Sequence, residues 1–165
     1  MATSAPPTKE HVLHILEQVT DPEVPVINVR ELGVLRGVDV SGDNVVVTIT
    51  PTYTGCPAMD VIKQDIEAAL HAAGVAHVEV KQVLAPAWST DEITEEGRRK
   101  LKDYGIAPPP HTADIRALRG AAPIVQCPHC GSTDTVMISA FGSTACKALW
   151  KCNDCLEPFD QFKCL

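Results

Sequence analysis

The 165-residue sequence is poor in aromatic residues and has no long apolar segment. Phe, Trp and Tyr make up 4% of the chain, whereas hydrophobic residues reach 45%, so we expect cores built from Val, Ile, Leu and Ala. No apolar run approaches the roughly 18 residues that a membrane-spanning helix needs. The opening MATSAPPTKE also lacks the basic and then apolar pattern of a secretory signal. We therefore expect a cytoplasmic protein with no membrane partner.

A surplus of positive charge is also missing. Lys and Arg number 14 against 21 Asp and Glu, which gives a net charge of −7. Such a balance opposes attraction to phosphate backbones. The cysteine-rich residues 126–165 show the same tendency, with three lysines against four acidic residues. The charge pattern therefore predicts no nucleic acid partner and argues against a nucleic-acid-binding zinc ribbon.

The apolar periodicity predicts an α+β domain with helices packed on one face of a small mixed sheet. A first helix is expected from Lys9, capped by Thr8. The segments LGVLRGVDV and VVVTITP flank the turn SGDN and predict an antiparallel hairpin. A second helix follows from Ala58 to a stop at Gly74, and the alternating stretch VAHVEVKQVL predicts a third strand.

We expect four consecutive parts along the chain. Residues 1–8 form a flexible tail, 9–106 the α+β domain, 107–123 a proline-rich linker and 124–165 a four-cysteine, zinc-ribbon-like metal-binding module. Within the domain, Ser89 followed by Glu92 has the spacing of a capping box before a charged helix. Within the linker, residues 113–119 could form one turn of helix.

Four of the seven cysteines lie in two C-x₂-C pairs. Cys127 and Cys130 form one pair, and Cys152 and Cys155 form the other. Two such turns can complete a tetrahedron of thiolates around one ion, and we expect the small module to need that ion to fold. Zinc suits a closed site of four thiolates, but the spacing also fits the single iron of rubredoxins.

Two further thiols in this region have no place in the tetrahedron. Cys146 follows Ser143 and Thr144 in a stretch that resembles a helix start, and it is a possible additional reactive thiol. Cys164 lies next to the C-terminal residue. Packing is the simpler role for both, because small buried thiols are common.

The remaining cysteine, Cys56, stands between Gly55 and Pro57 at a predicted strand-to-helix corner. Glycine permits the sharp entry, and proline is preferred at the first position of a helix. A sulfur there meets unpaired N–H groups and the positive end of the helix dipole, so we expect a stabilised thiolate. Three roles stay open: a nucleophile with a histidine base, a structural cap, and a ligand for a metal ion or cluster.

The stretch DPEVPV places Asp21 and Glu23 in a loop held extended by two prolines. The two carboxylates could reach the corner that carries Cys56. Alternatively, they could cap and solvate the loop. The sequence leaves both possibilities open.

Long composite motifs resemble two known families. The segments DPEVPVINVRELGVLRGV, VTITPTYTGCPAMDVIKQDI and LAPAWSTDEITEEGRRKLKDYGIAPP are similar to the domain of SufT-type iron–sulfur assembly proteins. Together with CPHCGSTDT and SAFGSTACKALWKCNDCLEPFDQFK, they resemble the D subunits of bacterial phenylacetyl-CoA epoxidase systems, the PaaD or PaaJ family. The likeness covers residues 9–165.

This resemblance implies an accessory subunit of aerobic phenylacetate degradation that is more a maturation factor than a catalyst. It implies assistance in assembling or delivering an iron–sulfur cluster, with the ferredoxin-type reductase component as recipient. By position, Cys56 matches the reactive cysteine of the assembly family, and Asp21 and Glu23 match its acidic loop. The four paired cysteines match the extra metal module of the D subunits. The chain lacks the paired Glu-x-x-His helices of a di-iron oxygenase.

A single cysteine cannot hold a cluster that needs four thiolates, so transient binding at Cys56 would require a homodimer or ligands from a partner. The alternative function is a structural or electron-transfer subunit of the same oxygenase, with zinc or a rubredoxin-like iron at the four-cysteine site.

Overall fold

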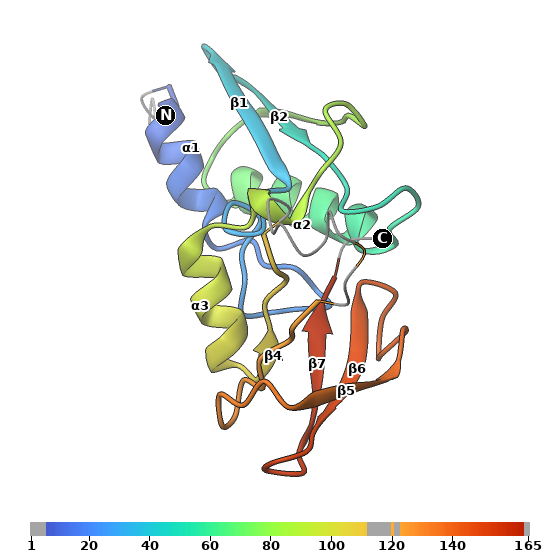
Figure 1. Cartoon of the computed structure of the whole chain (residues 1–165). Coiled ribbons are helices and arrows are strands. Elements are labelled where there is room, and N and C mark those ends of the chain that lie inside the picture. The colour runs from blue at the N-terminus through green and yellow to red at the C-terminus, as the bar shows by residue number, and fades with distance from the viewer. Residues whose placement is uncertain (1–5, 112–119, 121–122, 164–165) are drawn as a thin grey trace. The chain divides into compact units, whose positions relative to one another are not determined.

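The computed structural model describes residues 6–111, 120 and 123–163 and divides the chain into two compact units (Figure 1). The first unit ends at Trp88 and the second begins at Ser89. Within the described ranges, no helix is both long and apolar enough to cross a membrane.

The first unit is built on a sheet with the strand order β1-β2-β3. Strands β1 (Leu35–Ser41) and β2 (Asn44–Ile49) form the predicted antiparallel hairpin, and β3 (His77–Gln82) pairs with β2 in parallel. Parallel neighbours need a crossover connection, which helix α2 (Ala58–Ala72) supplies. The expectation of an α+β domain with a small mixed sheet is therefore confirmed.

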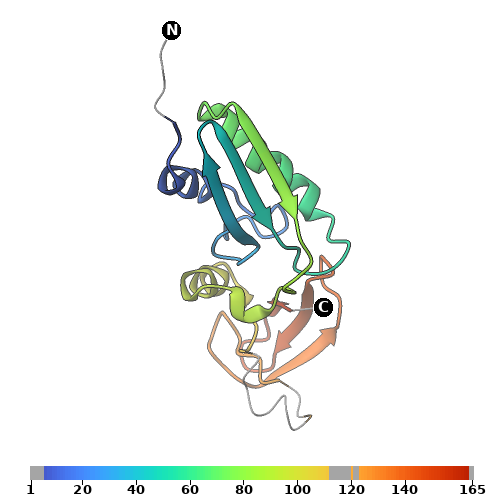
Figure 2. The same cartoon turned by 90° about the horizontal axis from the view of Figure 1, so that it is seen from above.

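Two helices of this unit bury their apolar sides. Helix α1 (Lys9–Leu16) contacts α2 and β1, and Figure 2 shows α2 running along one face of the three strands. The Thr8 hydroxyl accepts the N–H of His11 at 3.2 Å, which is the predicted cap. The buried side chains of α2 recur one turn apart, as the sequence pattern predicted.

The second unit contains a four-stranded sheet with the order β4-β7-β6-β5. The central strand β6 (Lys147–Cys152) pairs antiparallel with β5 (Thr135–Ser139) on one side and with β7 (Pro158–Phe162) on the other. The short β4 (Ile106–Ala107) pairs with β7 in parallel. The three long strands form the ribbon that the cysteine spacing suggested.

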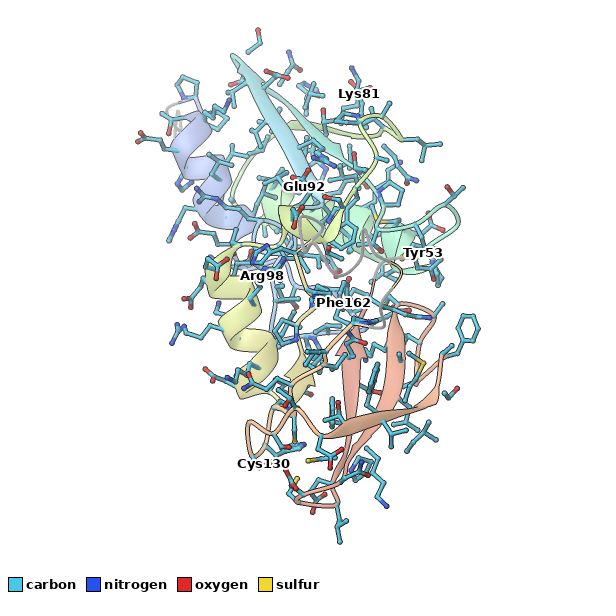
Figure 3. All side chains as sticks on the ribbon, in the orientation of Figure 1. Tyr53, Lys81, Glu92, Arg98, Cys130 and Phe162 are labelled. Carbon is cyan, nitrogen blue, oxygen red and sulfur yellow. The ribbon has the colours of Figure 1, made fainter. Side chains whose placement is uncertain are left out.

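The division between the units falls earlier than the sequence suggested. We expected residues 9–106 to form one domain, yet helix α3 (Glu95–Asp103) and β4 group with the C-terminal residues. The reason is hydrogen bonding that the sequence does not display. Strand β4 adds to the edge of β7, and the buried Arg98 of α3, labelled in Figure 3, donates to the carbonyl oxygens of Thr90 and Pro109.

Helix α3 also begins later than the predicted capping box. Ser89 precedes only the single 3₁₀ turn η1 (Thr90–Glu92), and its side chain makes no capping hydrogen bond there. Thr94 caps α3 instead, because its hydroxyl accepts the N–H of Gly97 at 3.1 Å. The predicted turn at 113–119 lies outside the described residues.

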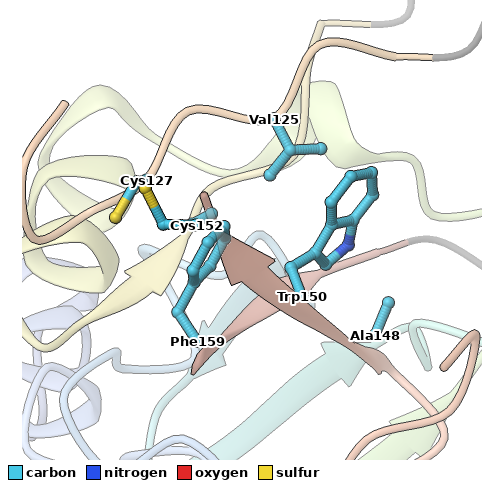
Figure 4. Packing of buried hydrophobic residues seen from close by; sticks show 7 residues of the cluster. Val125, Cys127, Ala148, Trp150, Cys152 and Phe159 are labelled. Carbon is cyan, nitrogen blue, oxygen red and sulfur yellow. The ribbon is translucent and has the colours of Figure 1, made fainter. Parts of the chain in front are cut away.

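One buried cluster of the second unit lies on one face of the ribbon (Figure 4). It contains only two of the chain's seven aromatic residues, Trp150 and Phe159. Two of its other members, Cys127 and Cys152, belong to the paired cysteines. The remaining members are Ala107, Val125 and Ala148.

Candidate functional site

The four paired cysteines converge at one end of the ribbon. Cys127 and Cys130 flank the turn that precedes β5, Cys152 ends β6, and Cys155 lies in the turn between β6 and β7. Their sulfur atoms all lie within 4.8 Å of one another. The structure therefore brings together all four cysteines that the sequence predicted to share an ion.

The spacing of the sulfur atoms fits tetrahedral coordination. A tetrahedron with metal–sulfur bonds of about 2.3 Å has sulfur–sulfur edges of about 3.8 Å. The Cys127 and Cys155 sulfurs are 3.7 Å apart, and those of Cys130 and Cys152 are 3.6 Å apart. An ion of the size of zinc or iron can thus be held by all four sulfurs without a change of the backbone.

The protonation of these thiols is uneven. Backbone N–H groups of Cys155 and Asp154 lower the pKa of Cys152 to about 7. The backbone N–H of Glu157 acts in the same direction on Cys155, but burial and hydrogen bonds to the other thiols raise the pKa of Cys155 to about 12. A metal ion that binds here must therefore displace protons.

His129 lies inside the first cysteine pair but belongs to a packing contact. Its ring covers Gly105, where a Cβ atom would come within 3.2 Å of the histidine Cε1. Gly105 also has a φ of +92°, a conformation that favours glycine. Through this contact, the segment after α3 packs against the turn that carries Cys127 and Cys130.

Cys146 does not begin a helix, contrary to the sequence-based expectation. It immediately precedes strand β6 and is buried, and its sulfur lies 3.1 Å from the hydroxyl of Thr144. The run of small residues before it resembles a helix start, but the ladder between β6 and β7 determines the local structure. Cys164 lies outside the described residues.

Cys56 occupies a tight corner directly before α2 in the first unit. Gly55 adopts a φ of +85°, and the Cys56 N–H donates to the Tyr53 carbonyl at 3.2 Å. Pro57 is the N-terminal capping position of α2. Tyr53, which Figure 3 labels, belongs to the same turn. The expected combination of glycine, cysteine and proline at a helix start is therefore present.

The Cys56 thiol is less acidic than the sequence led us to expect. Burial is the largest cause and raises its pKa, and the charges of Glu23 and Asp21 act in the same direction. Hydrogen bonds from the Ala58 N–H and the Thr52 hydroxyl lower the pKa but do not outweigh them. The helix start favours the thiolate as predicted, yet the half-buried sulfur beside two carboxylates remains protonated at neutral pH.

The loop that carries Asp21 and Glu23 is held near this corner. One carboxylate oxygen of Asp21 accepts the N–H groups of Glu23 at 2.7 Å and Val24 at 3.0 Å. Val24 and Ile27 are fully buried and anchor the loop to the core. Both carboxylates lie close enough to affect the pKa of Cys56. Thus Asp21 caps the loop, and it also contributes to the surroundings of the thiol.

Sequence reasoning missed Thr52. Its hydroxyl hydrogen bonds to the Cys56 sulfur, and the only sequence signal was the threonine-rich stretch TPTYTG. None of the groups that shift the pKa of Cys56 is a histidine, so the geometry gives no support to a nucleophile with a histidine base.

Two family models match the chain. The model described as "Iron-sulfur cluster assembly protein" matches residues 9–83, and the model described as "PaaD zinc beta ribbon domain" matches residues 111–163. The first match contains Asp21, Glu23 and Cys56, and the second contains all four paired cysteines.

Curated relatives match either the whole chain or a little more than half of it. A protein of Escherichia coli (strain K12), provisionally named as the D subunit of 1,2-phenylacetyl-CoA epoxidase, is 44% identical over 100% of this chain and 98% of its own length. An Fe-S protein maturation auxiliary factor of Porphyromonas gingivalis is 38% identical over 57% of this chain and 90% of its own length. A second such factor, YitW of Bacillus subtilis, is 35% identical over 56% of this chain and 92% of its own.

Solved structures resemble part of the chain. A domain of unknown function, DUF59, from Bacillus anthracis has a TM-score of 0.53 at 29% identity and covers 56% of this chain and 90% of its own. A conserved hypothetical protein from Thermotoga maritima has a TM-score of 0.52 at 34% identity, with 60% of this chain and 98% of its own covered. These likenesses support the α+β fold.

Proposed function

The chain belongs to the family of 1,2-phenylacetyl-CoA epoxidase D subunits, and from this premise we propose that it assists iron–sulfur cluster assembly or delivery to the reductase component of that system. The observation that carries the proposal is the Cys56 corner, where one thiol and two carboxylates meet in a domain that matches the iron–sulfur cluster assembly family. The protein is then an accessory subunit that loads a partner with its cofactor.

The raised pKa of Cys56 is compatible with this role. The negative charges of Glu23 and Asp21, which disfavour the thiolate, equally favour the approach of a cation. An iron ion that reaches the corner displaces the thiol proton and is bound by sulfur with oxygen ligands nearby. An incoming thiolate of the recipient can then exchange with Cys56.

The four-cysteine site has a different role in the proposal. Its four sulfurs complete a closed tetrahedron, and a closed site with no open position suits a structural ion. We infer that zinc occupies it and folds the ribbon that a partner recognises. A ligand for cluster transfer at Cys56 must come from a second copy of the chain or from the recipient, since one cysteine cannot hold a cluster.

The test compares Cys56→Ser with Cys146→Ser in the complete epoxidase system. Both changes remove one thiol outside the four-cysteine site, so they form a matched pair. We expect Cys56→Ser to lower the iron and sulfide content of the reductase component and its electron transfer rate, whereas Cys146→Ser leaves both unchanged. Full cluster content with the Cys56 variant would refute the delivery role.

The second candidate function is electron transfer through a single iron at the four-cysteine site. The first cysteine pair, with a proline and a following glycine in CPHCG, favours this interpretation, and the sulfur spacing fits iron as well as zinc. Metal analysis of the protein as isolated decides between them. A colourless protein with one zinc supports the structural role, and a red protein with one iron supports electron transfer.

A further inference from the structure

The second unit contains a cavity of about 340 Å³ that plays no part in the proposed function. Its lining is mostly apolar and includes Pro109, Pro123, Met137, Ala148 and Phe162. The volume lies within the range of roughly 300–1,000 Å³ that is usual for small-molecule sites. Such sites combine an apolar wall with a few polar groups that fix the orientation of the ligand.

Strand register places the cavity on the same face of the ribbon as the metal site, at the opposite end of β6. Cys152, Trp150 and Ala148 alternate along β6 and therefore share this face. Ala148 pairs with Gln161 of β7, so Gln161 also belongs to the face. Both Ala148 and Gln161 line the cavity. Trp150 and its packing partners separate the cavity from the four sulfurs.

Gln161 is the polar group that distinguishes this cavity from an apolar packing defect. The residue is only 5% exposed, and its side-chain amide has no hydrogen-bond partner in the part of the chain that the structure describes. The amide is not among the fully enclosed polar atoms of the described residues, so it faces space that water or a ligand can enter. A ligand that both donates to and accepts from this amide would satisfy it.

A second donor lies on the same face of β6, on Trp150, which does not itself line the cavity. The indole Nε1–H of Trp150 is buried without a partner among the described residues, and Figure 4 shows the indole nitrogen on the side of the ring toward Ala148. The Gln161 amide, which faces the cavity, and the enclosed Trp150 indole N–H thus occur on one sheet face around Ala148.

The two basic side chains at the rim are already engaged. Lys163 donates from Nζ to the Ala140 carbonyl and lies 4.3 Å from the centroid of the Phe141 ring. His111 lies 3.3 Å from a carboxylate oxygen of Asp91. The chain as a whole carries a net charge of −7, so its field disfavours an anion. A neutral ligand therefore fits the cavity better than a carboxylate.

We propose that this cavity is a binding site for a small neutral molecule with a flat apolar body and one carboxamide-like group. The apolar body fills the space between Pro109, Met137 and Phe162, and the polar group exchanges two hydrogen bonds with the Gln161 amide. This site shares no residue with the Cys56 corner or with the four paired cysteines, so the proposal for the cavity can hold whether or not the proposed function does.

The experiment uses the zinc-loaded full chain and three probes of the same shape: benzamide, isopropylbenzene and benzoate. Binding is followed by NMR through the methyl groups of Met137 and Ala148 and the side-chain amide of Gln161. We expect benzamide to bind with a Kd on the order of 0.1–1 mM, as is usual for a fragment. Benzoate should bind at least about tenfold more weakly.

Substitution then separates the polar from the apolar contribution. In Gln161→Leu, benzamide should bind on the order of tenfold more weakly while isopropylbenzene binds as well or better. The matched control is Gln64→Leu on the exposed surface of α2, which should change neither affinity. Ala148→Leu should fill the cavity and weaken both probes, and Met137→Ala provides a second cavity variant at a partly exposed position if Ala148→Leu loses zinc.

Two results would overturn the proposal. One is the absence of saturable binding for benzamide and isopropylbenzene at probe concentrations several times the expected Kd. That result would show that the cavity is not open to small molecules. The other is equal binding of benzamide to wild type and Gln161→Leu, which would show that the amide does not select the ligand. If a probe shifts only resonances of residues outside the cavity, it does not bind in the cavity, and the proposal is refuted in the same way.

Discussion

The guanidinium of Arg98 donates from Nη2 to the main-chain carbonyl oxygen of Thr90 at 2.7 Å. Its Nη1 donates to the carbonyl of Pro109, so one buried side chain joins the segments on either side of α3. No carboxylate accepts these bonds, and the side chain is 7% exposed. Arg98 is therefore a structural crosslink of the second unit.

Replacing this crosslink should destabilise the second unit. Arg98→Met keeps the apolar stem but leaves two buried carbonyl oxygens without donors, and we expect a loss of about 2–3 kcal/mol in the free energy of unfolding. The neighbouring Arg99→Met is the control, because Arg99 makes only an exposed ion pair with Glu96 and should change stability by less than about 0.5 kcal/mol. Urea unfolding followed by hydrogen exchange of β7 amides measures both. Equal effects would contradict the crosslink.

Proton release on metal binding should depend on pH. Below a pKa of about 7 the Cys152 thiol is protonated, and Cys155, with a pKa of about 12, is protonated at any physiological pH. Zinc therefore displaces the Cys155 proton throughout but the Cys152 proton only in acid. We expect close to one more proton released at pH 6 than at pH 8, and tighter binding at the higher pH. Calorimetry in buffers of different ionisation enthalpy counts these protons, and a constant count would show that Cys152 has an ordinary pKa.

Gly105→Ala should destabilise the attachment of the segment after α3. The new methyl group meets a φ of +92° and the His129 ring at 3.2 Å, and we expect a cost of about 1–3 kcal/mol. In a His129→Ala background only the backbone strain remains, so the cost of Gly105→Ala should be smaller by about 0.5–1 kcal/mol or more. The double-mutant cycle isolates this contact. Additive effects would mean that His129 does not touch the glycine.

The reactivity of Cys56 should respond to the charge of Glu23. Because Glu23 raises the pKa of the thiol, Glu23→Gln should move the pH midpoint of alkylation downward, whereas Thr52→Val should move it upward. Glu10→Gln, an exposed change in the first turn of α1, is the charge-matched control and should leave the midpoint in place. Peptide mass spectrometry of zinc-loaded protein follows Cys56 alone. An unchanged midpoint in Glu23→Gln would place the carboxylate away from the thiol.

Local patterns in the sequence were sufficient for much of the fold. The helix capped by Thr8, the hairpin around SGDN and the second helix ending before Gly74 all follow from periodicity and turn chemistry, because these signals act between residues that are close in the chain. The start of α3 was misplaced because Ser89 and Thr94 both offer a capping hydroxyl, and the choice depends on packing around the 3₁₀ turn. Cys146 was misread for a similar reason, since a strand pairing with β7 overrode local propensity.

Sequence patterns alone identified the residues that can do chemistry: the spacing of the four paired cysteines predicts a shared ion, and glycine and proline around Cys56 predict a helix start there. The spacing within each cysteine pair and the residues around Cys56 are short-range signals, whereas the convergence of the two pairs is a property of the folded ribbon. Three features come from the folded chain and not from any local pattern: Asp21 and Glu23 lie near Cys56 and raise its pKa, β4 joins the ribbon, and the Gln161 amide lines a cavity. Each depends on burial and on contacts between distant segments, which a linear pattern does not contain.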